Sequence, residues 1–98
     1  MRRGTTPTIT ISTDIDLTPA SNLFLTFKQG SRIVFEKELS ELAVEENKVT
    51  CKLSQQDTLL LHVERSLQFQ IRGTLNGEKI ASNIMSTSVS EIIKDGEI

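Results

Sequence analysis

The segment from Ser66 to Met85, SLQFQIRGTLNGEKIASNIM, constrains the fold more than any other part of this 98-residue chain. Apolar and polar residues alternate ahead of Asn76-Gly77, which is the period of a strand with one buried face. Asn-Gly favours a two-residue type I′ turn, because both residues accept a positive φ. The segment therefore predicts an antiparallel hairpin. Its predicted cross-strand pairs are Gly73 with Ile80, Phe69 with Ile84, and Leu67 with Ser86.

This register gives the hairpin one apolar face and one outer face. The apolar side chains, which we assign to the core, are Leu67, Phe69, Ile71, Ile80 and Ile84. The outer side chains are Gln68, Gln70, Arg72, Lys79, Asn83 and Met85. A shift of one residue would mix the two sets, so the turn and the pattern support each other. The alternation falters at Ser86 and Ser88, where we expect a bulge or a change of partner strand.

Further segments with the same alternation predict the remaining strands. They are Pro7–Thr13, Asn22–Gln29, Arg32–Glu38 and Lys48–Leu53. The leading proline predicts an edge position for the first of them, because proline lacks an N–H. The second and third form a hairpin of open register, in which Phe27 faces Val34 or Phe35 according to a loop of two or three residues.

Two short stretches interrupt the strands. Leu39–Val44 forms an irregular strand or a single helical turn, and Ser54-Gln55-Gln56-Asp57 has the spacing of a capping box before one short turn of helix. Six or seven short strands with frequent turns predict an all-β antiparallel sandwich of immunoglobulin-like size, with a small β-barrel as the alternative. We expect a single domain over residues 1–98, closing at Lys94-Asp95-Gly96, with residues 1–6 as a flexible N-terminal arm.

The residues with reactive side chains are few and scattered. Cys51 is the one cysteine, in an alternating run that points it inward, so no internal disulfide forms and a reducing cytosol suits the chain. His62 is the one histidine, and an inward cysteine is a poor nucleophilic partner for it. Asp14 and Asp16 have calcium-like spacing, but we interpret them as turn formers. We therefore expect no catalytic residue, no metal, no cofactor and no enzymatic activity.

Composition argues against several kinds of partner. The net charge of −2 is spread along the chain, which disfavours nucleic acid and anionic membranes. Tryptophan and tyrosine are absent, so an aromatic platform for a ligand is disfavoured. Met1-Arg2-Arg3 is followed by Gly4–Thr8, which lacks the apolar stretch of a signal peptide, so we expect synthesis and retention in the cytoplasm.

Four residues are candidates for protein contacts. Phe24 points opposite to its apolar neighbours Leu23 and Leu25, which places it in a second packing layer or in an interface. Arg72 lies on the outer hairpin face, and arginine is enriched in interfaces. Arg2 and Arg3 precede the first strand, in a segment that is either an arm that docks on a neighbouring subunit or an ordinary disordered start.

Several segments together resemble a known family. They are Met1–Thr8, Leu53–Leu59, Phe69–Arg72, Ala81–Ile84 and Lys94–Ile98. The chain resembles small proteins encoded in tailed phages and prophages of Gram-positive bacteria, usually near tail or baseplate genes. In size and strand pattern it is also similar to the N-terminal attachment domain of phage baseplate upper proteins.

This resemblance implies a structural or adaptor role in a phage tail or baseplate. The implied partners are further copies of the chain or another phage tail protein, first in the host bacterial cytoplasm and then in the virion. The family supplies no functional residues to transfer. A small module that binds a ligand or the host cell wall is the alternative.

Overall fold

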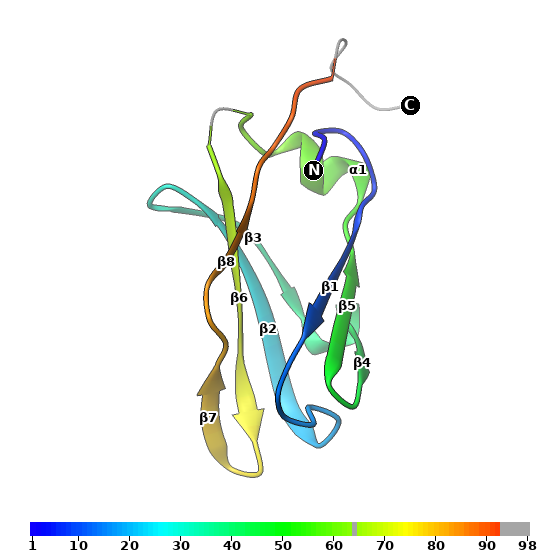
Figure 1. Ribbon diagram of the computed structural model, residues 1–98, viewed down its shortest axis with the longest axis vertical. Coiled ribbons are helices and arrows are strands. Elements are labelled where there is room, and N and C mark those ends of the chain that lie inside the picture. Colours follow the sequence, from blue (N-terminus) through cyan, green and yellow to red (C-terminus); the bar gives the residue numbers. More distant parts are fainter. Residues whose placement is uncertain (64, 93–98) are drawn as a thin grey trace.

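The computed structural model, which describes residues 1–63 and 65–92, is an antiparallel β-sandwich (Figure 1). Its strands are β1 (Thr8–Ser12), β2 (Ala20–Gln29), β3 (Arg32–Glu38), β4 (Ala43–Glu45), β5 (Lys48–Lys52), β6 (Leu67–Leu75), β7 (Glu78–Ala81) and β8 (Met85–Thr87). A three-stranded sheet has the order β1-β5-β4. A five-stranded sheet has the order β3-β2-β6-β7, with β8 also paired to β6. The all-β sandwich prediction is confirmed, and so is the edge position of the first strand.

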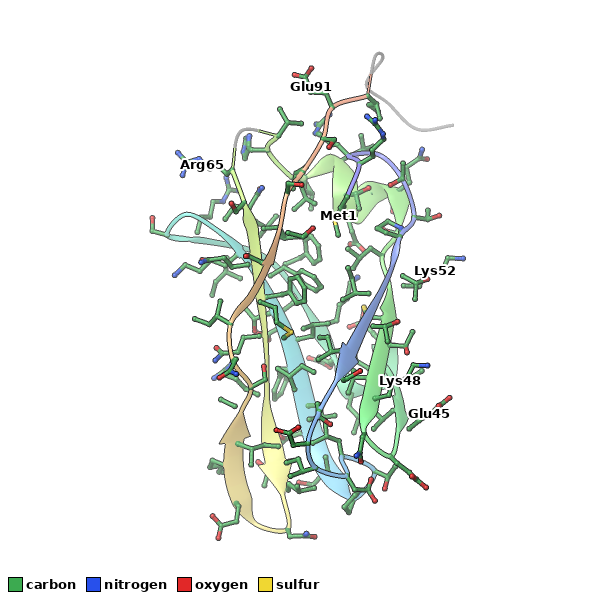
Figure 2. All side chains as sticks on the ribbon, in the orientation of Figure 1. Met1, Glu45, Lys48, Lys52, Arg65 and Glu91 are labelled. Carbon is green, nitrogen blue, oxygen red and sulfur yellow. The ribbon has the colours of Figure 1, made fainter. Side chains whose placement is uncertain are left out.

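The core lies between the two sheets, where the inward side chains of their strands meet (Figure 2). Its fully buried members include Leu23, Leu25 and Phe27 of β2, Val49 and Cys51 of β5, and Leu67 of β6. The Phe27 ring lies at the centre of an aromatic group, with its centroid 4.6 Å from that of Phe35 and 5.7 Å from that of Phe69. The alternation in each strand thus delivers one apolar face to a shared core.

The β2–β3 hairpin settles the register that the sequence left open. Gln29 pairs with Arg32, so the loop holds the two residues Gly30-Ser31. Phe27 nevertheless faces Phe35, because the register shifts between Phe27 and Lys28 and leaves Val34 as an extra residue. The bulge turns the Phe35 ring toward the core beside Phe27.

Both short interruptions have the predicted local structure. Leu39–Glu41 forms a 3-10 turn, η1, and the chain then enters β4, so each alternative for this stretch holds in part. Helix α1 spans Gln55–Leu59 and begins with the predicted capping box. The Asp57 N–H donates to Ser54 Oγ at 3.0 Å, and the Ser54 N–H donates to Asp57 Oδ2 at 2.9 Å.

The β6–β7 hairpin begins as predicted. Asn76 and Gly77 have φ values of 52° and 82°, and Gly73 faces Ile80. Beyond Ala81 the predicted register is wrong by one residue. The observed pairs are Phe69 with Met85, Gln68 with Ser86, and Leu67 with Thr87.

Ser82 gives the physical reason for this shift. The N–H of Ile71 donates to the Ser82 hydroxyl at 3.0 Å instead of to its carbonyl, and that carbonyl accepts from Gln70 Nε2 at 2.8 Å. The strand therefore ends, and pairing resumes one residue late in β8. Consequently Ile84, predicted in the core, is 64% exposed, and Met85, predicted on the outer face, packs against the core.

The chain changes partner after β8. Ser90 pairs in parallel with Arg2, and its N–H donates to the carbonyl of Met1 at 2.7 Å. The predicted change of partner near Ser86 and Ser88 thus occurs after Thr87, whereas the irregularity in the hairpin comes earlier, at Ser82. The predicted domain end at Lys94-Asp95-Gly96 lies outside the described residues.

Candidate contact surface

The outer face of the five-stranded sheet brings two of the predicted contact residues together. Across this sheet Phe24 of β2 has Glu38 of β3 on one side and Arg72 of β6 on the other. In the adjacent row, Thr26 lies between Glu36 and Gln70. We call Phe24, Glu36, Glu38 and Arg72 the outer patch.

Phe24 faces outward because β2 buries its neighbours completely. Leu23 and Leu25 have no exposed surface, and successive side chains of a strand point to opposite faces. The Phe24 ring lines an open hollow of about 520 Å³ together with Arg72, Lys79 and Ala81. The described residues form two sheets and no third layer over this ring, which leaves the Phe24 ring half-buried at the surface.

Arg72 keeps most of its hydrogen-bonding capacity. Its Nη2 lies 3.9 Å from Glu36 Oε2, and the Arg72 side chain is 59% exposed. Thr26 Oγ1 donates to the same carboxylate oxygen at 2.6 Å. Exposed pairs of this length contribute little to stability. Among the described residues no group accepts a hydrogen bond from Arg72, so its guanidinium is available to an incoming acceptor.

The two N-terminal arginines occupy a different part of the molecule. Arg2 is exposed, and its Nη1 donates to the Glu91 carbonyl at 2.8 Å. Arg3 is half-buried, and its guanidinium donates to the carbonyls of Leu59 and Leu61 at 2.7 and 2.8 Å. Arg3 thus ties the chain start to the end of α1, where carbonyls lack helical partners. The structure does not bring these residues to the outer patch.

Cys51 is inaccessible as a nucleophile. It is 1% exposed inside the core, and burial raises the pKa of its thiol. His62 is exposed after α1, where the Gln29 side chain binds its backbone N–H and carbonyl at 2.9 and 2.8 Å. A buried neutral thiol cannot attack a substrate.

The predicted turn role of Asp16 is confirmed. Its Oδ1 accepts from the Thr18 hydroxyl at 2.7 Å and from the Thr18 N–H at 2.9 Å. These two bonds, the hydroxyl first, lower the pKa of Asp16. Residues 1–63 and 65–92 hold no group of three or more His, Cys, Asp or Glu side chains arranged for a metal ion.

The sequence pattern indicates Phe24 and Arg72 separately but not their adjacency, which depends on β2 lying beside β6. In the part of the chain that the structure describes, no helix has the length and apolar character needed to span a membrane. No protein-family model, no curated protein and no solved structure matches this chain.

Proposed function

We propose that this protein is a non-enzymatic structural or adaptor component of a phage tail or baseplate, and that it acts through protein contacts at the outer patch. The observation that supports the proposal is the half-buried ring of Phe24 beside the exposed guanidinium of Arg72, which donates no hydrogen bond to any described residue. The resemblance to proteins encoded near phage tail genes supplies the biological setting. In this setting the chain is made in the host bacterial cytoplasm and incorporated into the virion.

The chemistry of the outer patch suits a protein interface. Aromatic residues and arginine are enriched in the cores of such interfaces, and they carry much of the binding free energy. Phe24 and Arg72 lie in β2 and β6, the two strands of the five-stranded sheet that are paired on both sides, so their backbones are already ordered. When a partner binds here, the backbone of this sheet therefore loses little conformational entropy.

The first experiment asks whether the protein is in the particle. Particles purified from an induced strain that carries the gene are analysed by quantitative mass spectrometry. We expect the protein in a fixed ratio to other tail proteins. Its presence in the producing cells together with its absence from purified particles would overturn the proposal.

The second experiment asks whether the outer patch makes the contact. Arg72→Glu reverses the charge beside Phe24, whereas the control Lys52→Glu makes the same reversal on an exposed residue of the three-stranded sheet. We expect incorporation of Arg72→Glu to fall at least about tenfold, which corresponds to about 1.4 kcal/mol of contact energy. Lys52→Glu should be incorporated like the wild type. Equal incorporation of both variants would exclude the outer patch as the contact.

A further inference from the structure

β1 has one edge without a partner strand. It pairs only with β5, through Ile9 opposite Cys51 and Ile11 opposite Val49. The Leu53 N–H donates to the carbonyl of Pro7 at 2.9 Å, and the N–H of Thr13 donates to the carbonyl of Asn47 at 2.8 Å. The odd-numbered residues of this segment therefore direct their N–H and C=O groups toward β5.

The even-numbered residues direct theirs to the open edge, because hydrogen-bonding direction alternates along an antiparallel strand. These residues are Thr8, Thr10 and Ser12, and their side chains are exposed. No described residue pairs with this edge. β1 thus presents a row of backbone donors and acceptors to solvent.

The other sheet edges are protected against strand addition. β3 carries a bulge at Val34 and the inward-pointing charge of Lys37, two features that block edge pairing. β4 and β8 are only three residues long. β7 has four residues and carries Glu78 and Lys79. Among the described strands, β1 alone has an uncharged edge of five residues without a bulge.

A groove of about 420 Å³ continues from this edge to the other sheet. Its apolar lining includes Ile11 and Ile15 on one side and Ile80 and Met85 on the other. Ile15 is 46% exposed, although it is a large apolar residue. A strand added to β1 would lie along this groove and remove apolar surface from water.

We propose that the occupant is a second copy of this chain, with the two β1 strands paired antiparallel about a two-fold axis through Thr10. The sequence TITIS reads nearly the same in both directions about Thr10. Thr10 therefore meets Thr10, Thr8 meets Ser12, and Ile9 meets Ile11 of the other copy. The hydrogen-bonding phase fits, because each even-numbered residue, whose N–H and C=O face the open edge, opposes an even-numbered residue of the other copy. Each such pair exchanges both N–H···O bonds.

The side chains in this register are compatible as well. Threonine and serine oppose each other on the outer face, and isoleucines do so on the inner face, both of which are favourable cross-strand pairs. No charged residues meet at the edge, because the strand has none. The two three-stranded sheets become one continuous sheet, and an isologous contact of this kind closes at two copies.

The inferred pairing rests on the proposed function only for its biological meaning, because a tail or baseplate component would use this pairing as its contact with a second copy. The test is therefore made on the purified protein. Thr10→Lys opposes two ammonium groups on the axis, whereas Ala43→Lys places the same charge in the same cross-strand row at the other edge of this sheet. Both positions are exposed, so both variants should fold.

Sedimentation velocity over a range of concentrations measures the oligomeric state. We expect the wild type and Ala43→Lys to form dimers and Thr10→Lys to remain monomeric. A wild type that stays monomeric up to about 1 mM overturns the pairing. If that monomer is still present in particles, the proposed function stands. A dimer whose protein is absent from particles overturns the proposed function and leaves the pairing.

A disulfide trap identifies the edge directly. In a hydrogen-bonded antiparallel pair the two Cα atoms lie about 5.5 Å apart, within the range that a disulfide spans. Thr10→Cys should give a cross-linked dimer on mild oxidation, and Ala43→Cys should not. Cys51 does not interfere, because it is buried. A wild-type dimer that Thr10→Lys leaves intact and Thr10→Cys fails to trap would place the contact elsewhere and overturn the proposal.

Discussion

Lys37 Nζ lies 2.9 Å from Asp57 Oδ2, and this ion pair joins β3 of one sheet to the helix that follows β5 of the other. Both side chains are 16% exposed. Partial burial by itself would lower the pKa of Lys37 and raise the pKa of Asp57. The hydrogen bond and the opposite charge outweigh burial in both, helped at Asp57 by bonds from Ser54. The pKa of Lys37 is therefore raised and the pKa of Asp57 is lowered.

We expect Asp57→Asn to lower the free energy of unfolding by about 1–3 kcal/mol at neutral pH, because it removes a charged hydrogen-bond partner. The folded pKa of Asp57 lies below its usual value of 3.8, so its contribution is present above that value and is lost as the pH falls through the folded pKa. The difference between variant and wild type should therefore shrink below pH 3.8. Urea unfolding at neutral pH and at about pH 2.5 measures it.

The same ion pair predicts an alkaline limit. The folded pKa of Lys37 lies above 10.5, so the contribution of Lys37 to stability is complete below pH 10.5 and is lost as the pH rises through the folded pKa.

Glu45→Gln, at an exposed carboxylate of β4, is the control for Asp57→Asn and should change the free energy of unfolding by less than about 0.5 kcal/mol. An Asp57→Asn difference of the same size at both acid and neutral pH would contradict this account.

Two positions in the β6–β7 hairpin favour glycine for different reasons, and substitutions should distinguish the two reasons. A Cβ at Gly73 would overlap the carbonyl oxygen of Asn22 and the side chain of Leu23. A Cβ at Gly77 would meet no atom within 4 Å, but the φ there is +82°. We expect Gly73→Ala to cost about 1–3 kcal/mol through overpacking and Gly77→Ala about 1–2 kcal/mol through backbone strain.

Asparagine tells the two mechanisms apart, because it accepts the left-handed conformation more readily than alanine does. Gly77→Asn should recover part of the stability that Gly77→Ala loses, whereas Gly73→Asn should be worse than Gly73→Ala. Denaturant midpoints of the four variants provide the comparison. Equal losses for alanine and asparagine at Gly77 would remove the backbone explanation.

Cys51 should react with a thiol reagent only when the core opens. Its thiol is 1% exposed, and burial raises its pKa, which reduces the reactive thiolate. We expect the labelling rate in native buffer to be far below that in urea, and to rise with denaturant. Ala43→Cys, at an exposed position of β4 outside the proposed pairing, provides the accessible control. Rapid labelling of the wild type in native buffer would contradict the burial of Cys51.

The alternation of apolar residues predicted the strands well, because a strand that buries one face must show that period. The pairing of Phe27 was not predictable in the same way. The partner of Phe27 is set by a two-residue loop together with a bulge at Val34, and these two features shift the register independently. The outer patch was beyond local patterns for a similar reason. Each strand points Phe24 or Arg72 outward by itself, but their contact depends on a long-range pairing of β2 with β6.

In the β6–β7 hairpin one side chain changes the register, although the turn forms as predicted. Asn76-Gly77 and the first pairs follow the prediction, and the Ser82 hydroxyl then takes the place of a backbone carbonyl in the ladder. Alternation along the chain contains no signal of this exchange, because serine is equally acceptable on a strand. The residues of β8, Met85–Thr87, therefore point to the face opposite to the predicted one.

This register shift predicts that substitution of Met85 destabilises the protein more than substitution of Ile84, which is the reverse of what the unshifted register predicts. Ile84→Ser should change the free energy of unfolding by less than about 0.5 kcal/mol, because Ile84 is 64% exposed. Met85→Ser should cost about 1–2 kcal/mol, because Met85 packs against the core and faces Phe69. Chemical denaturation of both variants measures the difference. Since the unshifted register would bury Ile84 and expose Met85, a larger loss for Ile84→Ser than for Met85→Ser would refute the register shift at Ser82.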